Sequence, residues 1–437
     1  MAVRWIMLPA FFLRSWINRT QSITGQSAMN QPTSKTIPLS LLAEIYAASP
    51  TGSLTNLELY DRVAEASGIG TAAVNASQPI GRARKLHSPV QRTIRWYQQT
   101  LRQMGVLERV DGQRGVWRLS ECAGKDLNRI IEGKQLVAFS TKLGVAIWSR
   151  HSDVFGSLTE PISLCVTSPP YPLRKERAYG GPSCTEFSDF MCGALEGIVR
   201  SLQPGGSIVL VVSNDVFEER SPARSLYLER LILALHDRLG LALMDRVPWV
   251  NYSKPPAPTW WACVNRVQLA VAYEHQLWFT NDPARVRSDN RRVLEEHSAR
   301  HRQLMAAGGE KRIAVYGDGA YKVRETSFSR ETSGRLPRNI MERGHSCSDT
   351  RAYRQNAKSM GLPMHGAMLP TSLPEFWIKF LTEGEEDLVV DPFGGTVRTG
   401  LAAERLGRRW LVTEWIREYL QGAATLFRGA PGFACNL

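Results

Sequence analysis

The chain has 437 residues, of which 43% are hydrophobic, so it can bury a core of roughly two or three domains and is not a disordered protein. Its formal net charge of +13 favours a polyanionic partner, and a nucleic-acid backbone is the usual one. Seven cysteines without a C-x-x-C pair argue against a disulfide framework and against a cysteine zinc site. No segment is apolar over a length that would span a bilayer, so no membrane partner is expected.

Residues 1–36 form a leader with an apolar patch over 5–13, which Pro9 interrupts. The patch is similar to a signal peptide, but no small-residue cleavage site follows it directly. We therefore expect residues 1–36 to be disordered and without function. The cysteine pattern, which is typical of reduced thiols, and the lack of a clear cleavage site together predict a cytoplasmic protein.

Residues 37–121 have the pattern of a small separate domain. Apolar residues recur at helical spacing in three segments, 41–48, 57–66 and 90–104, and a hairpin pattern follows over 106–119. Three helices followed by a hairpin resemble a winged helix-turn-helix, whose third helix would present Arg92 and Arg95 to a duplex. Winged helices also bind proteins, so a protein-interaction module is the alternative.

Residues 141–280 alternate between strand and helix patterns. They follow a connector at 122–140, which is expected to be helical as far as residue 135. This alternation is typical of an α/β sheet with crossover helices. The expected strands are 162–166, 207–213, 241–247 and 268–279, the expected helices are 187–202 and 226–239, and a Pro-Gly-Gly turn is expected at 204–206. The first of these strands ends in the loop Thr167-Ser168-Pro169-Pro170-Tyr171.

Residues 281–361 are rich in arginine, glycine and serine and contain few apolar runs. A solvated, partly disordered loop is one interpretation of this insertion, and contact with a nucleic acid is the other. The candidate DNA-binding residues are Arg291, Arg292, Arg335 and Arg338. His297 and His301 have the spacing of metal ligands on a helix, but no third ligand accompanies them, so we expect a solvated face and no metal.

Residues 362–437 contain a second strand that ends in a polar, glycine-containing turn. The strand, 388–390, leads into Asp391-Pro392-Phe393-Gly394-Gly395-Thr396, and a further strand, 408–412, leads to Glu414 and Trp415. Helices are expected at 373–381, 399–406 and 415–427. Ligands of open α/β sheets bind at the carboxyl ends of the strands, so the loops after 166 and 390 can line one crevice.

The two loops together resemble the DNA amino-methyltransferases that use S-adenosylmethionine. The order, with the Ser-Pro-Pro-Tyr loop first, resembles the permuted beta class, and a serine at its first position resembles the members that methylate the N4 amine of cytosine. The resemblance covers roughly residues 140–428. It implies an α/β, Rossmann-like methyltransferase sheet with helices on both faces, beside the winged-helix-like domain.

The same resemblance implies the partners of the chain. Double-stranded DNA is the expected substrate, and residues 281–361 lie where the beta class inserts its target-recognition region. A cognate restriction endonuclease is a candidate partner, in a bacterial, nucleoid-associated setting. The region 362–437 is then the cofactor-binding half of the domain.

The catalytic loop has the groups that methylation of an amine requires. The Ser168 hydroxyl and the Pro169 carbonyl can accept hydrogen bonds from the amine, while Pro170 helps to fix the backbone. Tyr171 offers a ring on which a flipped base can stack. Because orientation supplies much of the rate, no covalent intermediate is expected, and Cys165 is interpreted as core.

The cofactor loop is expected to work through close approach of its backbone. Gly394 and Gly395 remove the Cβ atoms that would block the cofactor. Asp391 either holds the loop or reaches the methionine amino group. Glu414 is placed to accept from ribose hydroxyls, and Trp415 to lie against adenine. The expected cofactor-binding residues are Asp391, Pro392, Phe393, Gly394, Gly395, Thr396, Glu414, Trp415 and His365, the last of these covering the methionine end.

The chain departs from the family pattern at two places. The family usually has Gly-Asp before the catalytic strand, which residues 147–153 lack, so Asp153 is a candidate for that role. The family usually has Gly-Thr-Thr where this chain has Val397-Arg398-Thr399, which brings the cofactor contacts into question. The alternatives are therefore an N6-adenine methyltransferase of the same fold and a catalytically inactive DNA-binding regulator, with an RNA methyltransferase less favoured.

Overall fold

The computed structural model describes residues 37, 39–49, 53–80, 85–103, 107–110, 112–119, 128–172, 180–252, 254 and 257–437. The leader expected over 1–36 therefore lies outside the described residues. Within the described part, no helix is long and apolar enough to cross a membrane.

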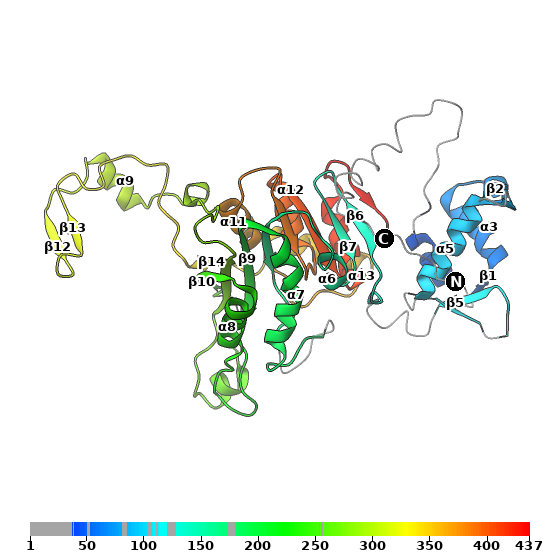
Figure 1. Ribbon diagram of the computed structural model, residues 1–437, viewed down its shortest axis with the longest axis horizontal. Coiled ribbons are helices and arrows are strands. Elements are labelled where there is room, and N and C mark those ends of the chain that lie inside the picture. The colour runs from blue at the N-terminus through cyan, green and yellow to red at the C-terminus, as the bar shows by residue number, and fades with distance from the viewer. Residues whose placement is uncertain are drawn as a thin grey trace.

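A ten-stranded sheet forms the body of the molecule, in the order β14-β10-β11-β9-β8-β15-β16-β7-β6-β17 (Figure 1). Its central strands, β9, β8, β15, β16 and β7, are parallel, and antiparallel strands extend it on both sides. The bounds are β6 Leu136–Ser140, β7 Gly144–Trp148, β8 Ile162–Thr167, β9 Leu202–Ser213, β10 Ala242–Val250, β11 Tyr273–Thr280, β14 Met341–Glu342, β15 Leu388–Asp391, β16 Arg409–Glu414 and β17 Ala434–Cys435. This is the α/β, mostly parallel sheet that the sequence predicts.

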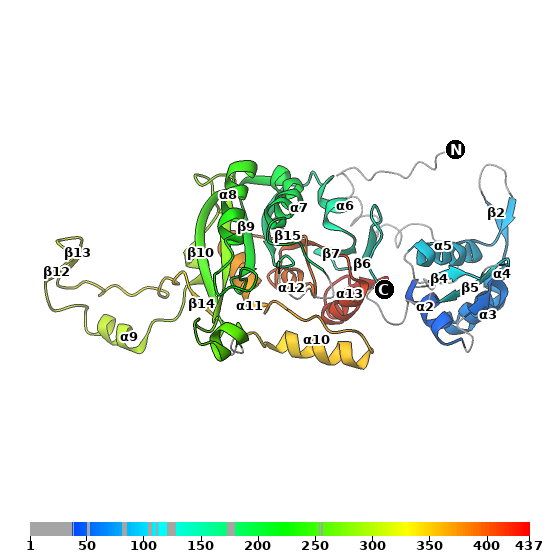
Figure 2. The ribbon, with the colours of Figure 1, turned by 90° about the horizontal axis from the view of Figure 1, so that it is seen from below.

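Helices cover both faces of the sheet because side chains of the central strands alternate between two cores. Val209 on β9 and Val412 on β16 face one core, whereas their chain neighbours Leu210 and Leu411 face the other. Figure 2 shows the two helical layers on opposite sides of the strands. One layer has α6 His151–Phe155, α7 Phe187–Ser201 and α8 Tyr227–Leu239, and the other has α11 Ser372–Leu381, α12 Arg398–Arg405 and α13 Arg417–Ala424.

Two expectations for the first half of this domain are wrong. Residues 136–140, expected to belong to the connector, form β6, which pairs with β7. Residues 128–135, which were expected to be helical, form no helix: Asn128 bonds to the Glu418 carboxylate and Arg129 forms a bridge with Ile416. The Pro-Gly-Gly at 204–206 is not a turn between elements but an irregularity inside β9, where the pairing with β8 shifts register.

The N-terminal domain has the three expected helices and the expected hairpin. Thr55 forms a capping box with Glu58 at the start of the second helix, and Gly68 ends it in a left-handed conformation. A short helix and a second hairpin were not predicted. The elements are α2 Leu39–Ala47, β1 Ser53–Thr55, α3 Asn56–Ser67, α4 Thr71–Asn75, β2 Gln78–Ile80, β3 Lys85–His87, α5 Pro89–Gln103, β4 Leu107–Arg109 and β5 Val116–Leu119, with β1, β5 and β4 in one sheet.

The segment expected to be one insertion, 281–361, divides into two parts. Residues 296–334, which we call the arm, contain α9 Ala299–Ala306 and the hairpin β12 Ala314–Tyr316 and β13 Tyr321–Val323, and they project from the β14 end of the sheet (Figure 1). In contrast, α10 Ser348–Ser359 packs on α13 with Tyr353 fully buried. The expectation is therefore wrong for α10, which belongs to the body of the molecule.

Candidate active site

The two loops singled out in the sequence lie side by side at one edge of the sheet. Strands β8 and β15 are parallel neighbours, with Leu164 opposite Val389 and Cys165 opposite Val390. Both loops therefore leave the sheet at its carboxyl edge, where they border one cavity of about 340 Å³. The residues predicted for the two loops and their surroundings all line this cavity: Ser168, Pro169, Pro170, Tyr171, His365, Asp391, Pro392, Phe393, Gly394, Gly395, Thr396, Glu414 and Trp415.

The Asp391 carboxylate joins the two loops. One oxygen accepts hydrogen bonds from Thr167 Oγ1 at 2.6 Å and from the Phe393 N–H at 3.0 Å, and the other accepts from Thr399 Oγ1 at 2.8 Å. Burial raises the pKa of Asp391 to about 6, although these hydrogen bonds oppose the rise. Of the two roles expected for Asp391, the geometry favours the one of holding the loop.

A chain of hydrogen bonds ends at the Ser168 hydroxyl. Ser168 Oγ lies 2.7 Å from Tyr171 Oη, which in turn lies 3.3 Å from Glu274 Oε2, and Lys254 Nζ contacts the other Glu274 oxygen at 3.1 Å. A carboxylate can only accept, so Tyr171 donates to Glu274 and is left to accept from Ser168. Ser168 Oγ then keeps its lone pairs for a donor in the cavity. The link between Glu274 and Ser168 depends on the pairing of β11 with β9, which the sequence does not show.

The glycine loop is packed against the neighbouring strand as well as against the cavity. A Cβ at Gly394 would lie 2.1 Å from Val412 Cγ1, so this glycine allows the loop to approach β16. Gly395 has a φ of 50°, in the left-handed region, and a Cβ there would lie 3.1 Å from His365 Nε2. The expected reason for Gly394, clearance for a cofactor, is therefore replaced by close packing within the protein.

Glu414 is buried at the end of β16 and is held by backbone donors. Its carboxylate accepts from the Gly395 N–H at 2.7 Å and from the Ile416 N–H at 2.8 Å. Burial is the largest influence and raises the pKa of Glu414 to about 7, although the backbone donors oppose it. The carboxylate is thus fixed beside the glycine loop, in the position from which a nucleotide-fold acid contacts ribose.

Comparison with known proteins identifies the family that shares this arrangement. A family model described as DNA methylase, N6_N4_Mtase, matches residues 162–425. The type II methyltransferase M.PvuII of Proteus hauseri is 34% identical over 269 residues, which cover 62% of this chain and 78% of that relative. The chain belongs to the N6/N4 DNA methylase family.

One further relative and one solved structure agree with this membership. The type II methyltransferase M.BglII of Bacillus subtilis is 24% identical over 274 residues, 62% of this chain and 64% of that relative. The solved structure titled PvuII DNA methyltransferase (cytosine-N4-specific) is 30% identical, with a TM-score of 0.52 over 66% of this chain and 87% of that chain. The family resemblance seen in the sequence is confirmed, and so is S-adenosylmethionine as the cofactor of the methylase.

The cavity of the methylase fits this cofactor. Its volume of about 340 Å³ lies in the range of small-molecule sites. Its wall combines the Glu414 carboxylate, the apolar side chains of Phe393 and Met368, and the buried guanidinium of Arg398, whose Nη1 has no hydrogen-bond partner among the described residues. An acid, an apolar wall and a cation suit a ligand with ribose hydroxyls, a methionine chain and a carboxylate.

The residue that stands near the missing Gly-Asp motif is His151, and the sequence analysis overlooked it. Asp153, the candidate for that role, does not line the cavity, and its carboxylate accepts from the Gly133 N–H at 2.9 Å. The proposal for Asp153 is wrong. His151 lines the cavity 5.0 Å from the Phe393 ring, and burial lowers the pKa of its imidazole to about 4, so it is neutral at physiological pH. His151 follows β7, a strand that the sequence did not predict, so no local signal identified it.

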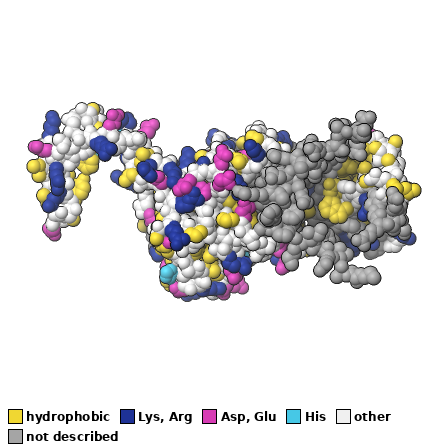
Figure 3. Space-filling view, turned by 45° about the horizontal axis from the view of Figure 1, so that its top comes forward, with side chains coloured by type: hydrophobic (Ala, Val, Ile, Leu, Met, Phe, Trp, Pro, Cys, Tyr) yellow, Lys and Arg dark blue, Asp and Glu magenta, His cyan; other side chains and the backbone are white. Residues whose placement is uncertain are grey.

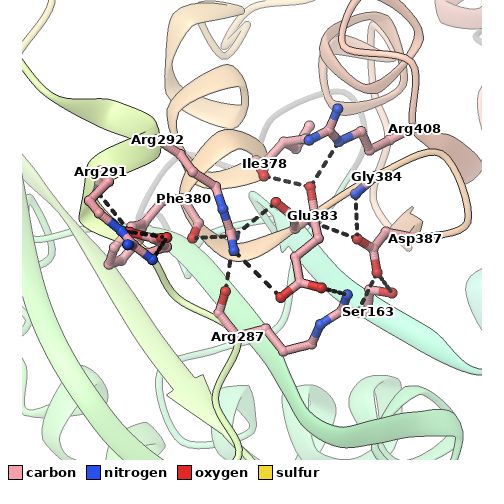
Figure 4. Close-up of polar contacts among 12 residues, drawn as sticks. Ser163, Arg287, Arg291, Arg292, Ile378, Phe380, Glu383, Gly384, Asp387 and Arg408 are labelled. Carbon is pink, nitrogen blue, oxygen red and sulfur yellow. Dashed lines mark hydrogen bonds and ion pairs between the residues drawn. The ribbon is translucent and has the colours of Figure 1, made fainter.

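The candidate DNA-binding arginines do not all present free cations. Figure 4 shows Arg292 beside the C-terminal end of α11, where its Nη1 donates to the carbonyls of Arg287, Phe380 and Thr382. We therefore reassign Arg292 to a structural role. Arg291 is exposed but binds Asp289, and Arg335 is exposed and pairs with Glu295 at 2.7 Å. The remaining candidates, Arg92, Arg95 and Arg338, are exposed, and Arg95 contacts the Tyr60 hydroxyl.

His297 and His301 lie close together, with ring centroids 4.8 Å apart, but His297 Nε2 bonds to Thr332. In the part of the chain that the structure describes, no group of three or more metal-ligating side chains is present. A metal at this pair is therefore not supported.

Proposed function

We propose that the methylase transfers the methyl group of S-adenosylmethionine to the N4 amine of cytosine in duplex DNA. The single observation that carries the proposal is the cavity shared by Ser168 and the Gly394–Gly395 loop. The similarity to a protein titled cytosine-N4-specific supports cytosine as the target base. By the same similarity to type II methyltransferases, we propose that it is the modification enzyme of a restriction-modification system.

The polarity of the Ser168 hydrogen bonds suits an amine substrate. The cytosine amine is a weak nucleophile because its lone pair is delocalised into the ring, and acceptors outside the ring plane favour a tetrahedral nitrogen. Ser168 Oγ, which donates toward Tyr171, can accept one amine hydrogen, and the Pro169 carbonyl can accept the other. The bound cofactor supplies an electrophilic methyl group. The rate of transfer is raised mainly because the amine and the methyl group are held in line.

The target base must leave the duplex to reach the cavity, so flipping is part of the proposal. The Tyr171 ring is the surface on which the base would stack. Its hydroxyl is fixed by Ser168 and Glu274, which holds the ring in one orientation. The Glu274–Lys254 ion pair thus acts as a positioning element for both side chains.

DNA contact is proposed for two regions outside the cavity. The first is α5, which carries Arg92 and Arg95 in the domain we interpret as a winged helix. The second is the arm, whose surface combines basic and hydrophobic side chains (Figure 3). The exposed Arg338 and Arg335 lie directly after the arm in the chain.

The proposed function is tested by mass spectrometry of nucleosides from DNA treated with the methylase and S-adenosylmethionine. N4-methylcytosine is the expected product. N6-methyladenine would assign the same fold to the other amine, and no methylated base despite binding of S-adenosylhomocysteine would favour an inactive DNA-binding protein. The variant Ser168→Ala serves as the control for a contaminating activity.

A further inference from the structure

Arg398 is a buried cation on the wall of the cavity. It is the first residue of α12, and only 2% of its surface is exposed. It stands at a position where the family usually has a threonine, so the family pattern gives it no role. A long cationic side chain in place of a short hydroxyl changes the chemistry of the cavity wall at this point.

The hydrogen bonds of the Arg398 side chain leave one nitrogen unused. Nε donates to Thr396 Oγ1 at 3.2 Å, and Nη2 donates to the Asp349 carbonyl at 3.1 Å. Among the described residues, Nη1 has no partner although it is buried. The nearby Asp349 carboxylate does not fill the gap, because it forms two hydrogen bonds with Arg405, at 2.7 and 2.9 Å.

A buried guanidinium without a carboxylate is an unstable arrangement in a protein interior. Burial is the largest influence and lowers the pKa of Arg398, although Cys347, Asp349 and Tyr353 oppose the shift. An anion that entered the cavity would complete the hydrogen bonds of Arg398 and compensate its charge. The two carboxylates that line the cavity, Asp391 and Glu414, are already held by hydroxyl and backbone donors.

S-adenosylmethionine has one anionic group, the carboxylate of its methionine part. We propose that Arg398 binds this carboxylate through Nη1, next to Thr396 and Met368. The inference rests on the cofactor of the proposed function. It assigns the binding of the cofactor carboxylate to a residue of this chain, Arg398, that stands where the family usually has a threonine. Arg150 is the other cation on the wall, but its side chain is 42% exposed and contacts Glu132.

The test is a double-mutant cycle measured by isothermal titration calorimetry on the full chain. The ligands are S-adenosylhomocysteine and its methyl ester, which lacks the carboxylate charge and carries one additional methyl group, and the proteins are the wild type and Arg398→Thr. We expect the wild type to bind the acid about 10- to 100-fold more tightly than the ester, as is typical of a charged hydrogen bond. In Arg398→Thr this preference should fall to less than threefold.

Further outcomes separate the inference from the proposed function. A wild type that binds acid and ester equally, or an Arg398→Thr variant that keeps the full preference, would overturn the role of Arg398 while leaving the methylase function intact. Loss of binding to both ligands by the same factor would make Arg398 a purely structural residue and overturn the role as well. A wild type that binds neither ligand would overturn the proposed function and this inference with it.

Three more variants keep the test decisive. Arg150→Ala is the matched control, and we expect it to retain the preference for the acid. If Arg398→Thr does not fold, Arg398→Lys keeps the charge and the approximate length, and we expect it to retain part of the preference, whereas Arg398→Met should lose it. Binding of 5′-methylthioadenosine, which lacks the amino-acid part, should be the same in every folded variant.

Discussion

At the scale of single residues, Ser168 illustrates how a neighbouring network decides the chemistry of a hydroxyl. A serine can donate or accept, and the sequence alone leaves both open. The Tyr171–Glu274 contacts remove that freedom, because the carboxylate end fixes the direction of the chain. Ser168 is therefore prepared as an acceptor before a substrate arrives.

We predict that Ser168→Ala lowers the rate of methyl transfer about 10- to 100-fold, the effect of one hydrogen bond to a group that gains charge. The dissociation constant of S-adenosylhomocysteine should change less than twofold, since Ser168 belongs to the proposed catalytic loop and not to the glycine loop. Single-turnover kinetics and calorimetry measure the two quantities. The exposed Ser359→Ala is the control, and an equal loss of rate and affinity in Ser168→Ala would contradict the assigned role.

Glu414 leads to a prediction on pH dependence. Its pKa is raised from the ordinary value of 4.5 to about 7, so the folded protein binds a proton more readily than the unfolded chain between these values. The stability that Glu414 contributes is fully present below about pH 4.5 and is lost as pH rises through about 7. The effect is on the order of 1–3 kcal/mol in the free energy of unfolding.

Thermal unfolding of the ligand-free wild type and of Glu414→Gln between pH 5 and 8 measures this effect. The wild type should lose stability relative to the variant as the pH rises. A difference that stays constant over this range would show that Glu414 does not titrate there. The same substitution should raise the dissociation constant of S-adenosylhomocysteine at least about tenfold if the Glu414 carboxylate accepts hydrogen bonds from the ribose hydroxyls.

At the scale of elements, sequence patterns predicted those helices and strands that carry their own signals. The helix α3 has a capping box at Thr55 and a glycine end, and β8 and β15 are short apolar runs followed by turn residues. Elements defined by tertiary pairing were missed. The strand β6 depends on β7, and the polar α10 depends on Tyr353 packing and on the Asp349–Arg405 ion pair.

The same distinction applies to the site. The residues of both loops were predicted because each loop is a local motif at the end of a strand. His151, Lys254 and the unused Nη1 of Arg398 were not, since their significance depends on neighbours that only the fold supplies. The departure Val397-Arg398 was visible in the sequence, but its consequence was not.

Val397 leads to a prediction at the junction of the loop and α12. It has a φ of 56°, in the left-handed region, and it is fully buried. Left-handed geometry costs a β-branched residue about 1–2 kcal/mol, and burial of its side chain returns about 1.5–3 kcal/mol. Val397→Ala loses the burial and keeps the strain, whereas Val397→Gly loses both.

We therefore expect Val397→Gly to be at least as stable as Val397→Ala in thermal unfolding. This order is the reverse of the usual one, in which glycine inside a helix is about 1 kcal/mol less stable than alanine. Gly-for-Ala at Ala402, inside α12 and also buried, should follow the usual order and is the control. A Val397→Gly variant clearly less stable than Val397→Ala would mean that the strain at this position is small.

At the scale of the whole molecule, the arm is separated from the sheet by a narrow base. Glu295 and Arg335 pair through two backbone hydrogen bonds, at 3.0 and 2.9 Å, and through an ion pair. The chain thus leaves and re-enters the body at one place. The arm has seven basic and five acidic residues, so its net charge is small. Electrostatic attraction to the DNA phosphates is therefore not expected to be its main contribution to binding.

The arm instead exposes apolar and aromatic side chains that water does not favour. Ile313 is 74% exposed, Val315 58% and Tyr321 52%, all on or beside the hairpin. Such side chains suit base edges and thymine methyl groups in a groove better than they suit solvent. Figure 3 shows hydrophobic and basic side chains together on this part of the surface.

We predict that replacing residues 296–334 with a short Gly-Ser linker preserves the body but removes sequence discrimination. The unfolding temperature and the affinity for S-adenosylhomocysteine should be unchanged within error, because the Glu295–Arg335 pair closes the gap. Non-specific DNA affinity should fall only a few-fold, since most basic residues lie elsewhere. Sequencing of methylated bases after treatment with the shortened protein measures the outcome: methylation of the wild-type target sequence at the wild-type rate would exclude the arm from recognition, whereas loss or scattering of methylation would assign recognition to it.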